Sequence, residues 1–207
     1  MKLQLLNGIF FSEHDLDIDH DSILQEVIDS RNNPQPSLHK SRPNQSEIDS
    51  FHTFYEDTNL YDKTYSTLKN SIDKLITSIF GGPMLIPTEI WGHIIPPMEQ
   101  TMVHNHRDGL IDPPGLSWAY YPHAPENAGG LTFITNVNGF TYNVSTTPKK
   151  GKLLLFSNSI LHYTPRNNSK IDRISISGNL KLTPELKDQL KNDLEYKNPY
   201  WYYAGRY

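Results

Sequence analysis

The chain has 207 residues, a formal net charge of −4 and no cysteine. This length is enough to bury a core as a single domain. The negative charge argues against bulk attraction to nucleic acid, and the lack of cysteine excludes disulfides, zinc–thiolate sites and thiol nucleophiles. No signal-peptide pattern opens the chain and no apolar run approaches the roughly 18 residues of a membrane span, so we expect a cytoplasmic protein without a membrane partner.

Residues 1–83 are predicted to be mostly helical support and loop. A weak alternation in Lys2–Phe11 suggests a strand, and an acidic stretch then leads into a helix capped by Asp21 or Ser22. Residues Ser30–Ser46 are rich in Asn, Pro and Ser and lack a period, which fits either a lid over a site or a plain connection. A second, interrupted helix is predicted from Glu47 to Phe80. The expected buried stripes of the two helices are Ile23, Leu24, Val27 and Ile28, and Leu68, Ile72, Leu75, Ile76 and Ile79.

Residues 84–182 change to short strands separated by Gly, Pro and Asn, a pattern typical of a sandwich or barrel. The predicted strands are Ile86–Ile95, Thr101–His106, Leu116–Tyr121, Gly130–Thr135, Thr141–Ser145, Lys152–Phe156, Ile160–Thr164 and Arg173–Leu180. Residues 183–207 should form a helix opened by Thr183-Pro184 and an aromatic tail. Such a tail must dock on this chain or on a partner, and a homodimer is one such arrangement.

The stretch around His106 carries the first chemical signal. His106 and Asp108 are two residues apart, so on an extended strand both side chains point to one face and can reach one metal ion. His162 follows the apolar run Lys152–Phe156 and is the candidate for a third ligand. Two histidines and one carboxylate form the facial triad that holds non-haem Fe(II) and leaves coordination positions open.

Arg173 and Ser175 carry the second signal. Both lie on one face of a predicted strand whose other face is apolar. Arginine can bind a carboxylate through two parallel hydrogen bonds, and the serine hydroxyl can add a third. An unpaired guanidinium would be unfavourable in such a buried place, so an anionic ligand is expected there.

These elements, in this order, resemble the 2-oxoglutarate- and Fe(II)-dependent oxygenases, whose pattern is His-x-Asp, a distal His, then Arg-x-Ser. The resemblance runs from about Trp91 to Leu180. It is closest to the prolyl-hydroxylase-like branch, in which a strand ending in Tyr-Tyr and a Gly-Gly turn follow the first ligand pair. Here these features are Leu116–Tyr121 and Gly129-Gly130.

The resemblance implies a double-stranded β-helix (jelly roll), mainly β with flanking helices. It implies that Fe(II) is held by His106, Asp108 and His162. His104 is an alternative ligand, because His104-x-His106 also places two side chains on one face and some phage-type relatives carry His-x-His here. We favour Asp108, since a carboxylate offsets one charge of the metal.

The same resemblance implies that 2-oxoglutarate is the cosubstrate. Its distal carboxylate would be bound by Arg173 and Ser175, helped by Tyr121, while Tyr120 faces the other way. The expected reaction uses O2, releases succinate and CO2, and hydroxylates a second substrate. Similarity to prolyl hydroxylases favours a peptidyl substrate of the prolyl type, and small molecules remain open. The competing hypothesis is a metal-containing jelly-roll binding or structural protein without turnover.

Overall fold

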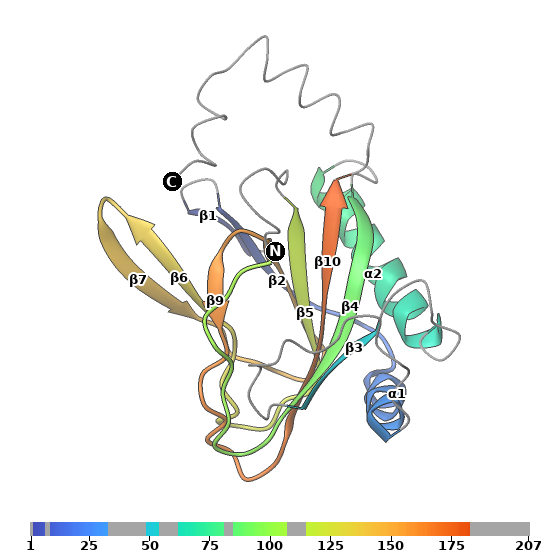
Figure 1. Ribbon diagram of the computed structural model, residues 1–207. Coiled ribbons are helices and arrows are strands. Elements are labelled where there is room, and N and C mark those ends of the chain that lie inside the picture. Colours follow the sequence, from blue (N-terminus) through green and yellow to red (C-terminus); the bar gives the residue numbers. More distant parts are fainter. Residues whose placement is uncertain are drawn as a thin grey trace.

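Figure 1 shows the chain as a computed structural model, which describes residues 2–6, 9–32, 49–53, 62–80, 85–106 and 115–182. Several predicted features lie outside these residues. They are Asp108, residues 33–46 of the loop that fits either a lid or a plain connection, and the predicted C-terminal helix with its aromatic tail. The expectations about the lid, the tail and a tail-mediated homodimer therefore stay predictions.

The larger of two sheets has seven antiparallel strands in the order β1-β2-β8-β5-β10-β4-β3. β10 lies between β5 and β4, so the strand that carries Arg173 is paired on both sides. The strands are β1 (Lys2–Leu6), β2 (Ile9–Asp15), β3 (Asp49–Thr53), β4 (Leu85–Ile95), β5 (Leu116–His123), β8 (Lys152–Ser157) and β10 (Arg173–Leu182).

The smaller sheet has the order β7-β6-β9 and consists of β6 (Thr132–Val137), β7 (Phe140–Ser145) and β9 (Leu161–Tyr163). Residues 101–106 run along β9 as a fourth segment. The Thr101 N–H donates to the Thr164 carbonyl at 3.0 Å, and His104 and His162 exchange two backbone hydrogen bonds of 2.9 Å. The two sheets face each other (Figure 1), which gives the predicted jelly roll, a double-stranded β-helix.

Two helices, α1 (His20–Asn32) and α2 (Asp62–Phe80), cover the outer face of the larger sheet (Figure 1). The predicted apolar stripes are the surfaces that pack there, led by Ile23, Val27, Leu68, Ile72 and Ile76. The predicted cap of α1 is wrong. Asp19 caps this helix through a 3.1 Å bond from the Ser22 N–H to its Oδ1, because a capping side chain must precede the first helical residue, His20.

Strict alternation divides the side chains of the larger sheet between two cores. Ile174 and Ile176 of β10 join the outer core under the helices, so Arg173 and Ser175 face the interior between the sheets. The interior core is lined by Ala119, Tyr121, Leu131, Phe133, Leu154, Phe156 and Ile160. The interior is therefore largely apolar, and the few polar groups that face it stand out.

Two predictions at the edges of the fold are wrong. Residues 49–53 form β3 at the edge of the larger sheet, where a helix was predicted from Glu47. The predicted strand Thr101–His106 is reduced to a single bridge at His104. The N-terminal part is therefore less helical than expected, since β1, β2 and β3 extend the larger sheet.

Within the described part of the chain, neither helix combines the length and apolar character that crossing a bilayer requires.

Candidate metal centre

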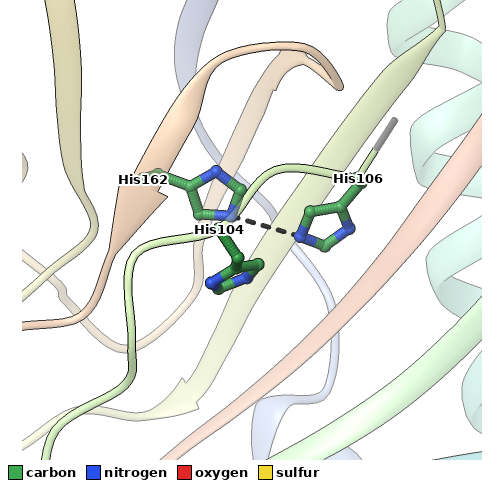
Figure 2. Close-up of side chains that lie close together, drawn as sticks. All are labelled: His104, His106 and His162. Atoms are coloured by element: carbon green, nitrogen blue, oxygen red, sulfur yellow. Dashed lines mark hydrogen bonds between the residues drawn. The ribbon is translucent and has the colours of Figure 1, made fainter. Parts of the chain in front are cut away.

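Three histidine side chains converge on one point (Figure 2), where His162 is buried, His106 is half-buried and His104 is exposed. His162 lies in β9, and His104 lies directly opposite it on the neighbouring segment. His106 follows two residues on, and its N–H donates to the Asn158 carbonyl at 2.9 Å. One ring nitrogen from each histidine lies within 4.8 Å of the others. The backbone pairing of two segments, 56 residues apart, therefore brings three imidazoles to one point.

Hydrogen bonds at Nδ1 decide which nitrogen can bind a metal. Nδ1 of His162 donates to the Ile160 carbonyl at 2.9 Å, and Nδ1 of His104 donates to the Met102 carbonyl at 2.8 Å. A carbonyl oxygen only accepts, so each neutral ring carries its proton on Nδ1. The lone pair of Nε2 is then free in both rings, which is the form that ligates a metal.

The spacing of the nitrogens fits a shared ion. Nε2 of His106 lies 3.2 Å from Nε2 of His162, along the dashed line in Figure 2. Two nitrogens that are each about 2.1 Å from one ion lie about 3.0 Å apart at a right angle and about 3.4 Å apart at a tetrahedral angle. The observed separation falls between these values. Imidazole donors also suit iron, so the donor set fits Fe(II).

Aromatic rings flank two of the three histidines. The Phe156 ring meets His162 edge-on with centroids 5.0 Å apart, and Trp91 stacks on His106 at 5.1 Å. Burial is the main cause that lowers the pKa of His162 to about 3, and the neighbouring His104 and His106 lower it further. His162 is therefore neutral at neutral pH, as a metal ligand must be.

Arg173 is the second polar group of the interior and is only 2% exposed. Its Nη1 donates to the Gly129 carbonyl at 3.0 Å and its Nη2 to the Thr164 hydroxyl at 3.2 Å. Its Nε has no hydrogen-bond partner among the described residues, and none of the carboxylates described there pairs with it. Burial lowers the pKa of this guanidinium, while Tyr121 opposes the shift.

Tyr121 lies beside Arg173, with the guanidinium carbon 5.6 Å from the ring centroid. Its hydroxyl is also buried without a well-formed hydrogen bond to a described residue, and burial raises its pKa. Tyr120 faces the opposite side, as predicted, where its hydroxyl bonds Nδ1 of His20. Trp118 shares that side and packs in the outer core, so it is not a wall of this site.

The two polar groups are neighbours across the sandwich. Thr164, which accepts from Arg173, follows His162 by two residues. On an extended chain this separation is about 6.6 Å, a distance that a short dicarboxylate can span. Ser175 is 3% exposed and lies one inward position beyond Arg173 on β10. The histidine cluster and a buried cation with donors left over therefore lie close together.

Both residues of the Gly-Gly turn are required by close approaches. Gly129 has a φ of +71°, and its carbonyl is the acceptor for Arg173. A Cβ on Gly130 would lie 2.3 Å from the Thr146 carbonyl oxygen, which no side chain tolerates. The turn can therefore pass close enough to offer a backbone acceptor to the buried guanidinium.

The predicted residues His106, His162, Arg173, Ser175 and Tyr121 all belong to this interior. His104 joins the cluster as well, while Asp108 lies outside the described residues, so the choice of third ligand stays open. Sequence reasoning missed Asn179 and Ser117, which bond to His106 and to each other. A sequence signal was present for Asn179, because it continues the two-residue alternation of Arg173 and Ser175 along the strand.

This architecture is the double-stranded β-helix of the 2OG-Fe(II) oxygenases, and the solved structures that match the chain include prolyl hydroxylases and other members of that class. A Trichoplax adhaerens prolyl hydroxylase, solved with a peptide fragment of the hypoxia inducible factor oxygen degradation domain, matches with a TM-score of 0.64 and 19% identity. The match covers 89% of this chain and 87% of the other. A Pseudomonas putida prolyl-4-hydroxylase matches with a TM-score of 0.57 and 16% identity, covering 84% and 92%.

The epimerase SnoN, solved with Fe3+, α-ketoglutarate and nogalamycin RO, matches with a TM-score of 0.61 and 12% identity, covering 83% of this chain and 78% of its own. At such identities the likeness establishes the fold and leaves the activity to be argued from the site. No protein-family model matches the sequence, and no curated protein does.

Proposed function

We propose that the chain is an Fe(II)- and 2-oxoglutarate-dependent oxygenase that hydroxylates a second substrate. One observation carries the proposal: imidazole nitrogens spaced for one ion and a buried guanidinium with an unused donor face the same interior. SnoN, a protein of similar fold, was solved with Fe3+ and α-ketoglutarate bound, which supports the proposal that this interior takes the same two ligands. A reducing compartment such as the cytoplasm, which keeps iron ferrous, is part of the proposal.

His106 and His162 hold the metal through Nε2. The third ligand is Asp108, because a carboxylate offsets one charge of the metal. His104 is the alternative, because it lies beside His106 and His162. The bound iron supplies the oxidising chemistry, in which O2 converts 2-oxoglutarate to succinate and CO2 and gives its other oxygen atom to the substrate. The protein supplies the geometry of the ligands and the apolar walls of Phe156 and Trp91 that exclude water.

Arg173 binds the distal carboxylate of 2-oxoglutarate. Its Nε–H has no partner among the described residues and the Tyr121 hydroxyl has no well-formed one there, and a carboxylate supplies acceptors for both. Ser175 adds a hydroxyl from the next inward position of β10. The carboxylate also balances the positive charge that burial makes unfavourable.

The proposed substrate is a peptidyl residue of the prolyl type. The support is the resemblance of the motifs and the likeness to a hydroxylase solved with a peptide. SnoN, solved with nogalamycin RO, indicates that small molecules are the alternative class of substrate. A screen for succinate release should therefore include proline-containing peptides, amino acids and small metabolites, and mass spectrometry should find one added oxygen atom in the substrate that responds.

Anaerobic titration tests the metal and cosubstrate directly. Fe(II) and 2-oxoglutarate together should give a weak visible charge-transfer band, and admission of O2 should release succinate. Asp108→Ala should abolish both, while His104→Ala should keep them. The reverse result would assign the third position to His104. A band and turnover that survive in His162→Ala would overturn the proposed centre.

The second candidate, a metal-binding jelly roll without turnover, is favoured by the same histidine cluster. It predicts metal bound in the purified protein but no 2-oxoglutarate binding and no succinate with any substrate. Isothermal titration of the anaerobic Fe(II) protein with 2-oxoglutarate separates the two candidates.

A further inference from the structure

A hydrogen-bonded pair of side chains on the larger sheet, Asn179 and Ser117, contacts His106 of the histidine cluster. The side-chain oxygen of Asn179 lies 2.9 Å from Nδ1 of His106 and accepts the hydroxyl of Ser117 at 2.7 Å. Asn179 and Ser117 are direct partners in the register of β10 and β5. The contact therefore depends on the central strands of the larger sheet, whereas the backbone of His106 is bonded to Asn158 in the turn that follows β8.

The orientation of the Asn179 amide decides the chemistry of His106. If the amide oxygen faces Nδ1, the neutral ring keeps its proton on Nδ1 and the lone pair of Nε2 is free. If the amide nitrogen faced Nδ1, the proton would move to Nε2 and be donated to Nε2 of His162, 3.2 Å away. The cluster would then be closed by an internal hydrogen bond, and a metal would first have to displace a proton.

Ser117 selects the first arrangement. Its side chain is fully buried, so its hydroxyl proton needs an internal acceptor, and the Asn179 oxygen is that acceptor. Trp91 holds the ring from the side, with its plane 26° from that of His106. The register of β10 against β4 shifts directly after Asn179, so this side chain is still directed inward where the regular pairing is interrupted.

We propose that Asn179 is a positioning residue whose side-chain oxygen, oriented by Ser117, holds the proton of His106 on Nδ1 and so keeps Nε2 available to a metal. This inference rests on the proposed metal site. The same hydrogen bond orients the ring. It fixes Nδ1 toward Asn179, and Nε2, which points away from Nδ1, then faces His162. Outer partners of this kind typically change metal affinity by about 10- to 100-fold.

Metal-free protein labelled with 15N at histidine provides the first test. NMR of the wild type should show His106 with the proton on Nδ1, and Asn179→Leu, which keeps the volume but removes the acceptor, should shift the population toward the Nε2 proton. Asn179→Asp keeps an acceptor oxygen and should keep the wild-type tautomer. Ser117→Ala should give an intermediate population. A role in packing alone would leave the tautomer unchanged.

Titration with Co(II), followed by its visible absorption, provides the second test. Asn179→Leu should bind Co(II) about 10- to 100-fold more weakly, Asn179→Asp should bind like the wild type, and Asn143→Leu on the exposed strand β7 is the matched control. Wild-type His106 with its proton on Nε2, or an unchanged Co(II) affinity in Asn179→Leu, would overturn the inference. Failure of the wild type to bind Co(II) would instead overturn the proposed metal function, and the tautomer would still decide the role of Asn179.

Discussion

At the scale of single residues, the burial of Arg173 is the feature that most constrains which ligand can bind between the sheets. A guanidinium has five N–H donors, and the two bonds to Gly129 and Thr164 leave Nε without a partner among the described residues. Burial of a cation is unfavourable unless an anion compensates it. The neighbouring Tyr121 hydroxyl also has no well-formed hydrogen bond within the described part of the chain, so the two donors together suit an anion with at least two acceptor atoms.

Replacement of Arg173 by lysine should therefore weaken 2-oxoglutarate binding. Lysine keeps the charge but loses the planar fork that binds a carboxylate through two bonds. We expect the KM for 2-oxoglutarate to rise about 10- to 100-fold, equivalent to one lost charge-assisted hydrogen bond. Succinate release as a function of 2-oxoglutarate concentration measures it. Arg166→Lys, at an exposed position, is the control, and an unchanged KM in Arg173→Lys would exclude this residue from the cosubstrate site.

Gly130 makes a prediction about stability. Its Cβ would meet the Thr146 carbonyl oxygen at 2.3 Å, so Gly130→Ala must displace the backbone of the turn. We expect the free energy of unfolding to fall by about 1–3 kcal/mol in urea denaturation. Gly139→Ala is the control, because it meets no atom within 4 Å and pays only for a φ of +82°. Equal losses in the two variants would show that the close approach to Thr146 is not the cause.

At the scale of elements, the two-residue period predicted the inner strands correctly because their pattern is local. β10 shows this best, since Arg173 and Ser175 face the interior and Ile174 and Ile176 the helices. β3 could not be predicted in this way. Its five residues become a strand through pairing with β4, which lies far along the sequence, and the local sequence does not encode that partner.

The same distinction applies to the candidate site. His106 and His162 were paired in advance because the motif order supplied the long-range information. His104 could not be excluded, since all three side chains at 104, 106 and 108 share a face on an extended chain. The bridge between His104 and His162 explains why that histidine also points into the cluster. Only the folded chain reveals this pairing, because residue spacing alone carries no register.

The loop before β10 connects both halves of the site through Asn167, which is fully buried. Its Nδ2 donates to the carbonyls of Ile95 and Ile171, and its Oδ1 accepts from the backbone and hydroxyl of Ser169. Its backbone N–H and carbonyl bond residues 98 and 99, just before the metal segment. The backbone and side chain of this one residue therefore connect that segment to the loop that leads into Arg173.

Asn167→Ala should loosen this connection. The buried carbonyl of Ile95 loses this donor, while the carbonyl of Ile171 keeps the Ser169 hydroxyl, so we expect a loss of about 1–3 kcal/mol in the free energy of unfolding. Amide hydrogen exchange should also become faster at Met98 and Thr101. Their N–H groups donate to the backbone carbonyls of Asn167 and Thr164, respectively. The neighbouring Asn168→Ala, at an exposed position, is the matched control. Stability equal to that of the control would show that the loop holds its shape without this side chain.

At the scale of the whole molecule, the site joins the two layers of the sandwich. Two of the imidazoles are anchored by the backbone pairing of the smaller sheet, whereas Arg173 and Tyr121 belong to the larger sheet. A metal and a cosubstrate bound between them add contacts across the interior. Binding should therefore stabilise the folded chain as a unit, in proportion to the logarithm of ligand concentration.

Without metal, the stability of the whole chain should depend on pH through His162. Its pKa is 6.5 in an unfolded chain and about 3 in the fold, chiefly because of burial. Between these values the unfolded state binds a proton that the folded state does not, so the free energy of unfolding falls as pH falls from 6.5 toward 3. The contribution approaches about 1.4 kcal/mol per pH unit and vanishes above the upper value.

Because carboxylates also titrate in this range, the measurement is the difference between the wild type and His162→Gln in urea unfolding with a chelator present. The wild type should show the steeper loss of stability, and parallel curves for the two proteins would mean that this imidazole is not neutral and buried in the fold.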